Sequence, residues 1–396
     1  MRKKQLLVLI SLLLVVFLAL TGCGQKTQVA DKSEPDVVEE TPIEQLVEAP
    51  VDTKDLPTLK IGYIYTNHQT PLMMAAHKAD GFKDQGVYLK EVIAKQKYIL
   101  MEQDAPIANV ELVVNKSGSE TMTMIAQGHI DLAIASNTAF ITSTDQGNAV
   151  KILAPVHTEG IALVVPIDSS IKNWEEFTAK AKSGDKPYTV GYHSPTSAPL
   201  ILLEAALRDA GLTYSKNPED VKVNITLMDL KGTGNLIPAM TSGQVEAWVG
   251  PSPYPELAVT EGVGKVALDM KDLPPKGKWH DFPCCVLGTT DIVATEHNHE
   301  VEKLVELLTI SANYCAANME EAAEVTSEFT GVSLEASKLS TIKYTTNPSE
   351  AWLINMGLTY DTLKETDNIS NLLKDKSFKE AENDLFNFSF INKVIN

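Results

Sequence analysis

Polar side chains that could hold a small molecule stand directly after several predicted strands, where each strand should give way to a helix. Asn67, His68 and Gln69 form the first such set, and they precede a proline that suits the first turn of a helix. Their amide and imidazole groups could bind a ligand. They could equally cap the helix by accepting hydrogen bonds from its free backbone N–H groups. We treat the set as candidate ligand contacts, with capping as the alternative.

Two further sets follow the next predicted strands. Ser117 stands three residues before Glu120, which is the spacing of a capping box, so a structural role competes there with ligand binding. Ser136, Asn137 and Thr138 follow the later strand and begin another helix. Their side chains could point into a cleft while one of them also caps the helix.

The segment 192–199 is the richest in hydroxyl groups, and it lies between a predicted strand and a long helical pattern. Ser194, Thr196 and Ser197 all stand at this one helix start. Free N–H groups at a helix N-terminus favour anions and other hydrogen-bond acceptors, so we expect these side chains to contact a ligand. The alternative is a structural turn fixed by two prolines.

Three more candidate contacts come from a later loop and from an expected crossing between lobes. Ser252 and Tyr254 lie in the proline-rich loop 250–255. This loop resembles the W-x-P loop of the nitrate, sulfonate and taurine group of periplasmic-type binding proteins, and the resemblance implies that the ring of Tyr254 covers the ligand. The alternative is a rigid turn with the ring packed on its own lobe. His157 lies where the chain should first cross between lobes, and it could face the cleft.

Histidine spacing and the scarcity of arginine limit the chemistry of this site. Four histidines are conceivable metal ligands: His68, His157, His193 and His280. None has the close spacing of a metal motif, and we predict no metal ion, no cofactor and no catalytic residue. Arg208 lies about 13 Å along its helix from Pro199, so no guanidinium clamp reaches the helix start. A neutral hydrogen-bonding ligand, or an anion held by helix ends, fits better.

An alternation of strands and helices must position these side chains. Short β-branched runs predict strands at 59–65, 109–114, 131–135, 151–155, 189–192, 223–227 and 246–250. Helical patterns lie between them at 71–83, 120–127, 198–210 and 236–242. Such alternation is typical of an α/β fold with parallel strands and crossover helices.

The length of the body predicts two lobes. About 340 residues follow the N-terminal segments, which is more than one small core usually holds and implies a cleft between two α/β lobes. We expect 57–160 to begin the first lobe, 161–275 to form the second, and 276–396 to return to the first and add C-terminal helices. Hinges are expected near 156–163 and 275–288.

The first 23 residues are typical of an export signal. Three cations precede an apolar run over 6–20, which is shorter than the roughly 20 residues of a spanning helix. The segment Leu20-Thr21-Gly22-Cys23 resembles the bacterial lipobox. This resemblance implies that Cys23 is acylated and anchors the chain to the outer face of the cytoplasmic membrane. The acidic segment 24–56 contains prolines and no aromatic residue, as a disordered tether does.

Charge and cysteine content exclude two further classes of protein. A formal net charge of −18 argues against nucleic acid as a partner. Beyond Cys23 three cysteines remain, and the neighbours Cys284 and Cys285 could pair only in a strained ring, so no disulfide framework is expected. Cys315 falls on the apolar stripe of a helix that starts near residue 298, and we predict that it is core. A strand over 284–294 should return the chain to the first lobe.

Two segments share a pattern of helix end, glycine, polar residue, acidic residue and strand: Ala126–Ala133 and Thr241–Trp248. With Ile61-Gly62-Tyr63 and the later segment 79–87, they resemble the nitrate, sulfonate and taurine group of periplasmic-type binding proteins. The resemblance implies a type II periplasmic-binding-protein fold, a monomer, an ABC permease with its ATPase as partners, and ligand capture by hinge closure. The ligand would be a small polar or anionic molecule of the nitrate, sulfonate or taurine type, or a pyrimidine or thiamine precursor.

Two alternatives use the same fold. Phe282-Pro283-Cys284-Cys285 partly resembles the cysteine-rich patch of the thiamine pyrimidine synthase family, although that patch is a longer cysteine run and its members work in the cytoplasm. Because this chain has an export signal and no evident catalytic dyad, we expect a binding protein and not an enzyme. A lipoprotein sensor or adhesin without a transporter is the other alternative.

Overall fold

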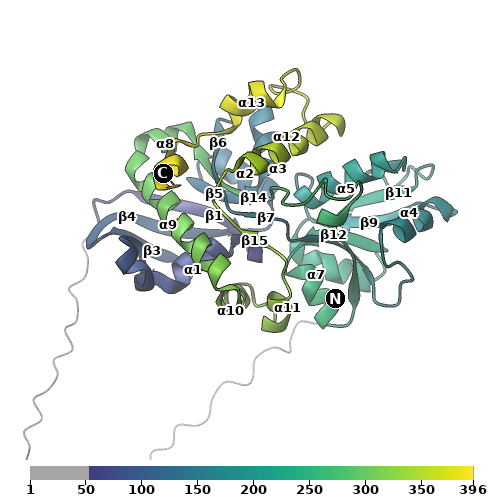
Figure 1. Cartoon of the computed structure of the whole chain (residues 1–396), viewed down its shortest axis with the longest axis horizontal. Helices are drawn as coiled ribbons and strands as arrows, with labels where there is room; N and C mark the ends of the chain where they lie inside the picture. The colour runs from purple at the N-terminus through teal and green to yellow at the C-terminus, as the bar shows by residue number, and fades with distance from the viewer. Residues whose placement is uncertain (1–52, 396) are drawn as a thin grey trace, which may run out of the picture. The chain divides into compact units, whose positions relative to one another are not determined.

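The computed structural model describes residues 53–395 (Figure 1). The expected signal peptide, the acylated Cys23 and all but the last residues of the expected tether lie outside the described residues. The first strand, β1, spans Thr58–Ile64.

Seven strands form the first sheet, in the order β2-β3-β4-β1-β5-β14-β6. Their bounds are β1 (Thr58–Ile64), β2 (Val87–Ile93), β3 (Lys97–Glu102), β4 (Ala105–Asn115), β5 (Leu132–Ser136), β6 (Val150–Pro155) and β14 (Cys285–Thr290). β1 is parallel to both β4 and β5. The β2–β3 hairpin and the returning strand β14 are antiparallel to their neighbours, so the sheet is mixed.

Six strands form the second sheet, in the order β10-β11-β9-β12-β8-β13. Their bounds are β8 (Ile161–Pro166), β9 (Tyr188–Tyr192), β10 (Tyr214–Ser215), β11 (Ile225–Asp229), β12 (Ala247–Pro251) and β13 (Gly264–Asp269). β9 is parallel to β11 and β12, whereas β8 is antiparallel to β12 and β13.

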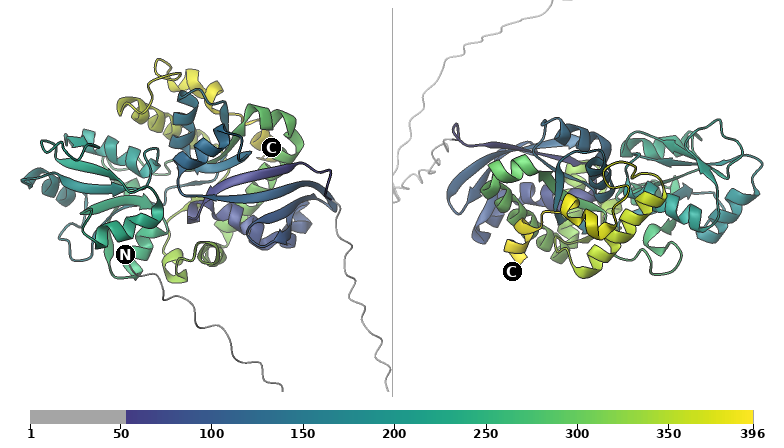
Figure 2. Two further views of the ribbon diagram at one scale, coloured as in Figure 1. Left: turned by 180° about the vertical axis from the view of Figure 1, so that it is seen from behind. Right: turned by 90° about the horizontal axis from the view of Figure 1, so that it is seen from above.

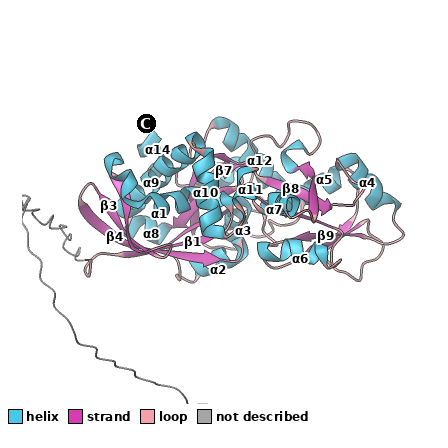
Figure 3. Ribbon diagram, turned by 90° about the horizontal axis from the view of Figure 1, so that it is seen from below, coloured by secondary structure: helices cyan, strands magenta, loops and turns pink. Residues whose placement is uncertain are grey.

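Helices cover both faces of the first sheet. One face carries α1 (Thr70–Lys78), α9 (Asn298–Ala317) and α10 (Met319–Thr330), and the other carries α2 (Gly118–Ala126), α3 (Asn137–Asp145), α12 (Glu350–Glu365) and α13 (Phe378–Leu385). Figure 3 shows α1 and α9 on the opposite side of the strands from α2. Strand β5 explains this layering, because Leu132 and Ile134 pack with the first group whereas Ala133 and Ala135 pack with the second.

The second sheet is covered in the same way, by α4 (Trp174–Ser183) and α5 (Ala198–Asp209) on one face and by α6 (Leu236–Thr241) and α7 (Tyr254–Thr260) on the other. The remaining helices are η1 (Asn67–Gln69), η2 (Ala79–Gln85), η3 (Thr233–Asn235), η4 (Met270–Asp272), α8 (Asp291–Glu296), α11 (Leu334–Lys338) and α14 (Ser389–Ile395). Figure 2 shows the fold from behind and from above.

The chain passes between the sheets in two places that lie next to each other. It leaves β6 through β7 (His157–Thr158) and enters β8, and it returns between η4 and β14. β7 also pairs with β15 (Lys343–Tyr344) from the C-terminal region. The buried carboxylate of Glu159 ties these segments together, because it accepts the N–H of Asp281 at 2.9 Å and forms an ion pair with Lys343 at 3.1 Å.

The structure corrects two of the expected elements. The returning strand ends at Thr290 and not near residue 294, because the Thr290 hydroxyl accepts the N–H of Val293 and so begins helix α8. The helix expected over 71–83 ends at Lys78, since Ala79 has a φ of 43° that an α-helix does not accommodate. The chain continues there as the 3₁₀ helix η2.

The burial of Cys315 and the lengths of the helices bear on two expectations from the sequence. Cys315 is fully buried on α9, which confirms that it belongs to the core. No helix within residues 53–395 combines the length and the apolar character needed to cross a membrane.

Candidate ligand site between the two sheets

A small cavity lies between loops of the two sheets. Its volume is about 30 Å³. The lining residues are Ile64, Thr66, His68, Gln69, Gly118, Ser136, His193, Ser197, Ala198, Pro199, Thr233, Pro251, Cys284 and Cys285. Most follow the ends of β1, β5, β9 and β12, which is where open α/β sheets bind ligands. A molecule held there would contact both sheets.

Three polar atoms of this lining have no hydrogen-bond partner: Gln69 Oε1, His193 Nδ1 and Ser197 Oγ. All three side chains are buried. Buried polar atoms are nearly always paired in folded proteins, so these atoms are positions that a ligand could satisfy. Ser197 also precedes the twelve-residue helix α5 without capping it, which leaves both its hydroxyl and the first N–H groups of the helix for an acceptor.

Beside the cavity, five hydroxyl side chains join the two sheets, and we call them the hydroxyl latch: Ser119, Ser136, Thr138, Ser194 and Thr196. Ser119 Oγ lies 2.9 Å from Ser194 Oγ and 3.0 Å from Thr196 Oγ1. Ser136 and Thr138 donate to the Thr196 carbonyl at 3.1 and 2.6 Å. Four of these residues were candidate ligand contacts. Apart from Ser136, which also lines the cavity, the structure places them in contacts between the two halves of the protein.

Three other candidates make structural contacts outside the cavity lining. Ser117 accepts the N–H of Glu120 and caps α2. Asn137 donates to the Pro283 carbonyl at 2.9 Å, and Asn67 donates to Ser340 Oγ at 2.6 Å. These side chains hold loops in place around the site.

The candidates from loop 250–255 also lie outside the lining. Ser252 donates to Glu256 Oε1 at 2.6 Å within its own loop and helix. Tyr254 donates to the Tyr65 carbonyl at 3.3 Å, so it connects the two sheets and does not cover the cavity. Of the expected contacts, His68, Gln69, Ser136 and Ser197 are the ones that the cavity brings together.

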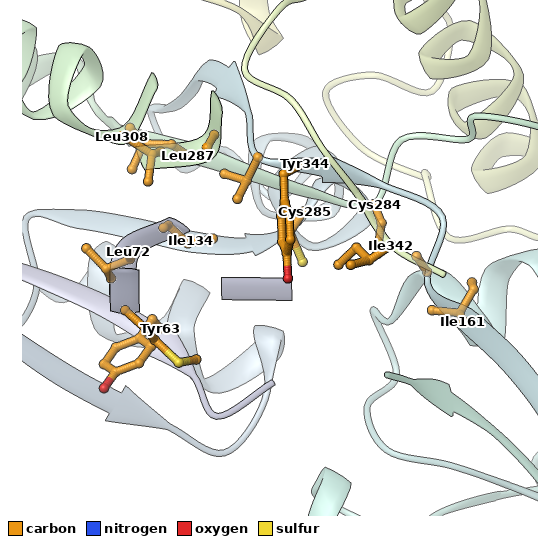
Figure 4. Close-up of a cluster of buried hydrophobic side chains, with 14 of the residues drawn as sticks. Tyr63, Leu72, Ile134, Ile161, Cys284, Cys285, Leu287, Leu308, Ile342 and Tyr344 are labelled. Carbon is orange, nitrogen blue, oxygen red and sulfur yellow. The ribbon is translucent and has the colours of Figure 1, made fainter. Parts of the chain in front are cut away.

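At one end of the cavity the crossing segments bring together His68, His157, Cys284 and Cys285, which we call the His–Cys cluster. One ligand-type atom from each residue lies within 4.8 Å of the others, and all four side chains are buried. Figure 4 shows Cys284 and Cys285 in this buried region, near Ile342 and Tyr344. Spacing along the chain does not bring the histidines and the cysteines together, because more than 200 residues separate His68 from the cysteines.

Burial and mutual contact perturb these groups. Burial lowers the pKa of His193 to about 4, with a further contribution from His68, and burial also lowers the pKa of His157. The hydrogen bond to Cys285, together with burial, raises the pKa of Cys284 well above its usual range. Burial opposes ionisation of Cys285 as well, but contacts with Cys284 and the histidines lower its pKa, so Cys285 is the more acidic thiol of the pair.

Comparisons with known proteins identify the family of this chain. A family model described as the NMT1-like family matches residues 52–328. The chain belongs to the NMT1-like family. A curated relative, the uncharacterized protein MJ1180 of Methanocaldococcus jannaschii, is 34% identical over 116 residues, which are 29% of this chain and 80% of the relative.

Three solved structures share the architecture. The zinc-bound ligand-binding component of an ABC-type import system from Staphylococcus aureus has a TM-score of 0.65 at 18% identity, covering 85% of this chain and 99% of its own. The periplasmic nitrate-binding protein NrtA from Synechocystis PCC 6803 has a TM-score of 0.66 at 17% identity, covering 87% and 89%. The alkanesulfonate-binding protein SsuA from Xanthomonas axonopodis pv. citri, bound to MOPS, has a TM-score of 0.58 at 15% identity, covering 79% and 94%.

These matches confirm two predictions from the sequence: the resemblance to the nitrate and sulfonate group, and the periplasmic-binding-protein fold. Because the sequence identities to these three structures are below 20%, the likeness shows a shared fold. Ligand and partners depend on the site residues of each protein.

Proposed function

We propose that this protein is an extracytoplasmic solute-binding lipoprotein of an ABC importer, which captures a small polar or anionic molecule by closing its two lobes around it. The observation that carries the proposal is the cavity, because both sheets line it and because three buried polar atoms in its lining lack partners. Such atoms supply the few convergent polar groups that a ligand site needs. The proteins of similar fold described above bind nitrate or an alkanesulfonate, or serve an import system, which supports the same role here.

The size and chemistry of the cavity favour a small ligand. A cavity needs roughly 10–15 Å³ to hold one water molecule, so the cavity of about 30 Å³ has room for little more than a small planar anion or a few heavy atoms. The one arginine among the described residues, Arg208, lies at the far end of α5 and pairs with Glu365 at 3.6 Å. An anion would therefore be held by Ser197, the start of α5 and neighbouring polar groups.

A ligand screen with two matched serine variants tests this proposal. The purified protein is titrated with nitrate, small sulfonates, pyrimidines and thiamine precursors, and a true ligand raises the melting temperature because it binds only the folded chain. Ser197→Ala should abolish the shift while leaving the unliganded melting temperature nearly unchanged, since Ser197 makes no cap bond. Ser117→Ala should do the reverse, costing about 1 kcal/mol of stability and keeping the ligand shift.

The outcomes separate this role from its alternatives. A shift that both variants retain would place the ligand elsewhere. A well-folded protein that responds to none of these compounds would favour the sensor or adhesin, and chemical turnover of a bound pyrimidine precursor would favour the synthase.

The membrane anchor has its own test. Cys23→Ser should remove the acylation site and release the exported protein from the membrane fraction, as measured by fractionation and by metabolic labelling with a fatty acid. Membrane retention of the unlabelled variant would refute anchoring through Cys23.

A further inference from the structure

The His–Cys cluster has the composition and spacing of a metal site. His68 Nδ1 lies 3.5 Å from Cys284 Sγ and 3.8 Å from Cys285 Sγ. Tetrahedral zinc has Zn–N bonds of about 2.1 Å and Zn–S bonds of about 2.3 Å, which places its nitrogen and sulfur ligands about 3.6 Å apart. The two distances from His68 Nδ1 to the sulfurs lie on either side of that value.

The ring of His68 is held in the orientation that metal binding requires. Its Nε2 lies 2.8 Å from the Gly160 carbonyl and donates to it, so Nδ1 is the nitrogen left free to face the sulfurs. A backbone carbonyl on the second ring nitrogen is a common support for a metal-binding histidine. Gly160 is also required there: its φ is +77°, and a Cβ would stand 3.2 Å from His68 Nε2.

His157 is the fourth member of the cluster, and it lies on β7, where the chain first crosses between the sheets. The rings of His68 and His157 have centroids 4.1 Å apart. His157 Nε2 now accepts the N–H of Cys285 at 3.2 Å, a hydrogen bond that a metal at this nitrogen would replace. Outside the set, Gln69 donates to Cys285 Sγ at 3.5 Å, which adds support to that sulfur.

Charge selects among the metals that two sulfurs and two nitrogens can bind. Two thiolates and two neutral imidazoles carry a charge of −2, so a divalent ion gives a neutral complex, whereas Cu⁺ would leave a net negative charge in a fully buried site. The three residues His68, Cys284 and Cys285 also line the cavity, so the cluster borders it directly.

We propose that His68, His157, Cys284 and Cys285 form a tetrahedral site for one divalent soft metal ion, with Zn²⁺ as the best fit. The site goes beyond the proposed solute-binding role. It joins the first sheet to both crossing segments and does not use residues 161–275.

Metal binding is tested on the full-length protein, purified with reductant in detergent and stripped with a chelator. Zn²⁺ should bind one equivalent per chain in competition with a chromogenic chelator, and Co²⁺ should give sulfur-to-metal charge transfer and tetrahedral visible bands. Cys284→Ser, Cys285→Ser and His157→Gln should each weaken Zn²⁺ binding by more than about 100-fold, because each removes a direct ligand. Cys315→Ser is the matched control, since this thiol is equally buried but lies in the core.

The spectra keep the test informative if a variant folds poorly. Loss of one Co²⁺–thiolate charge-transfer contribution in a serine variant whose melting temperature is unchanged would support the site. The proposal is overturned if the wild-type protein binds no stoichiometric metal, if Cys315→Ser is as defective as the cluster variants, or if mass spectrometry of protein purified without reductant finds Cys284 and Cys285 joined to each other and unresponsive to Zn²⁺. The solute screen can be repeated with a chelator present. A negative result for metal binding therefore does not affect the test of solute binding.

Discussion

The hydroxyl latch and the His–Cys cluster both connect segments around the cavity, but they do so with opposite chemistry. The latch consists of neutral hydroxyl groups, several of them partly exposed, that exchange hydrogen bonds across the two sheets. The cluster consists of fully buried imidazoles and thiols on the crossing segments. Water can replace hydroxyl contacts at small cost, whereas groups in the dry cluster have no such substitute.

This difference suggests a division of labour. In the proposed opening of the lobes, the contacts that break are best made by hydroxyl groups, because their net contribution is small. Contacts at the crossings need not break, and there the chain uses buried ionisable groups and the ion pairs of Glu159. This division predicts that stability is concentrated at the crossings and that opening is controlled at the latch.

The largest expected effect concerns His193, which faces the cluster from the second sheet. Its pKa is lowered to about 4 in the folded protein against 6.5 when exposed, so below pH 6.5 the unfolded chain binds a proton that the folded chain does not. Stability should therefore fall as the pH drops from about 6.5 to about 4, by up to about 3 kcal/mol. Urea unfolding of the chelator-treated protein across this range measures the loss.

His193→Gln should flatten that part of the pH profile, whereas substitution of the exposed His129 by glutamine should not. An unchanged slope in His193→Gln would mean that other groups cause the acid sensitivity, His157 first among them because burial lowers its pKa as well.

A smaller effect is expected at Glu159, which is buried where the chain first crosses. Glu159→Gln keeps an acceptor for the Asp281 N–H but removes the ion pairs with Lys343 at 3.1 Å and Lys271 at 3.6 Å. Both lysines are partly exposed, so we expect a loss of about 2 kcal/mol in the free energy of unfolding. Glu320→Gln, which breaks an exposed pair with Lys338, should cost much less. Equal losses in the two variants would show that the crossing is not a special point of stability.

The sequence predicted the α/β class of this fold because strand and helix patterns alternate along the chain. The apolar stripe that includes Cys315 is a local pattern of the same kind, and it predicted the buried face of α9. The β2–β3 hairpin was not predicted. The end of the returning strand at Thr290 was not predicted either, because it depends on one hydrogen bond from the Val293 N–H to the Thr290 hydroxyl.

The candidate site was harder to predict, because side-chain direction in a loop is fixed by partners far away in the chain. Ser136 and Asn137 are neighbours, yet Ser136 lines the cavity whereas Asn137 turns to the Pro283 carbonyl. The members of the His–Cys cluster come from both crossing segments and from the loop after β1, so their proximity depends on the tertiary fold. The adjacent cysteines inside an expected hinge range were its one local signal.

The smallest expected effect is at the latch, and it bears most directly on opening. Ser119→Ala removes the hydroxyl that lies 2.9 Å from Ser194 Oγ and 3.0 Å from Thr196 Oγ1. If these bonds favour the closed form by about 1 kcal/mol, calorimetric titration with a ligand from the screen should show roughly fivefold weaker binding, mostly through faster release. Thr123→Ala is the control, since its hydroxyl donates to the Ser119 carbonyl on the same helix and crosses no cleft. Should both variants bind ligand as the wild type does, closure would have to be stabilised by the ligand alone, and the latch would only mark where the two sheets meet.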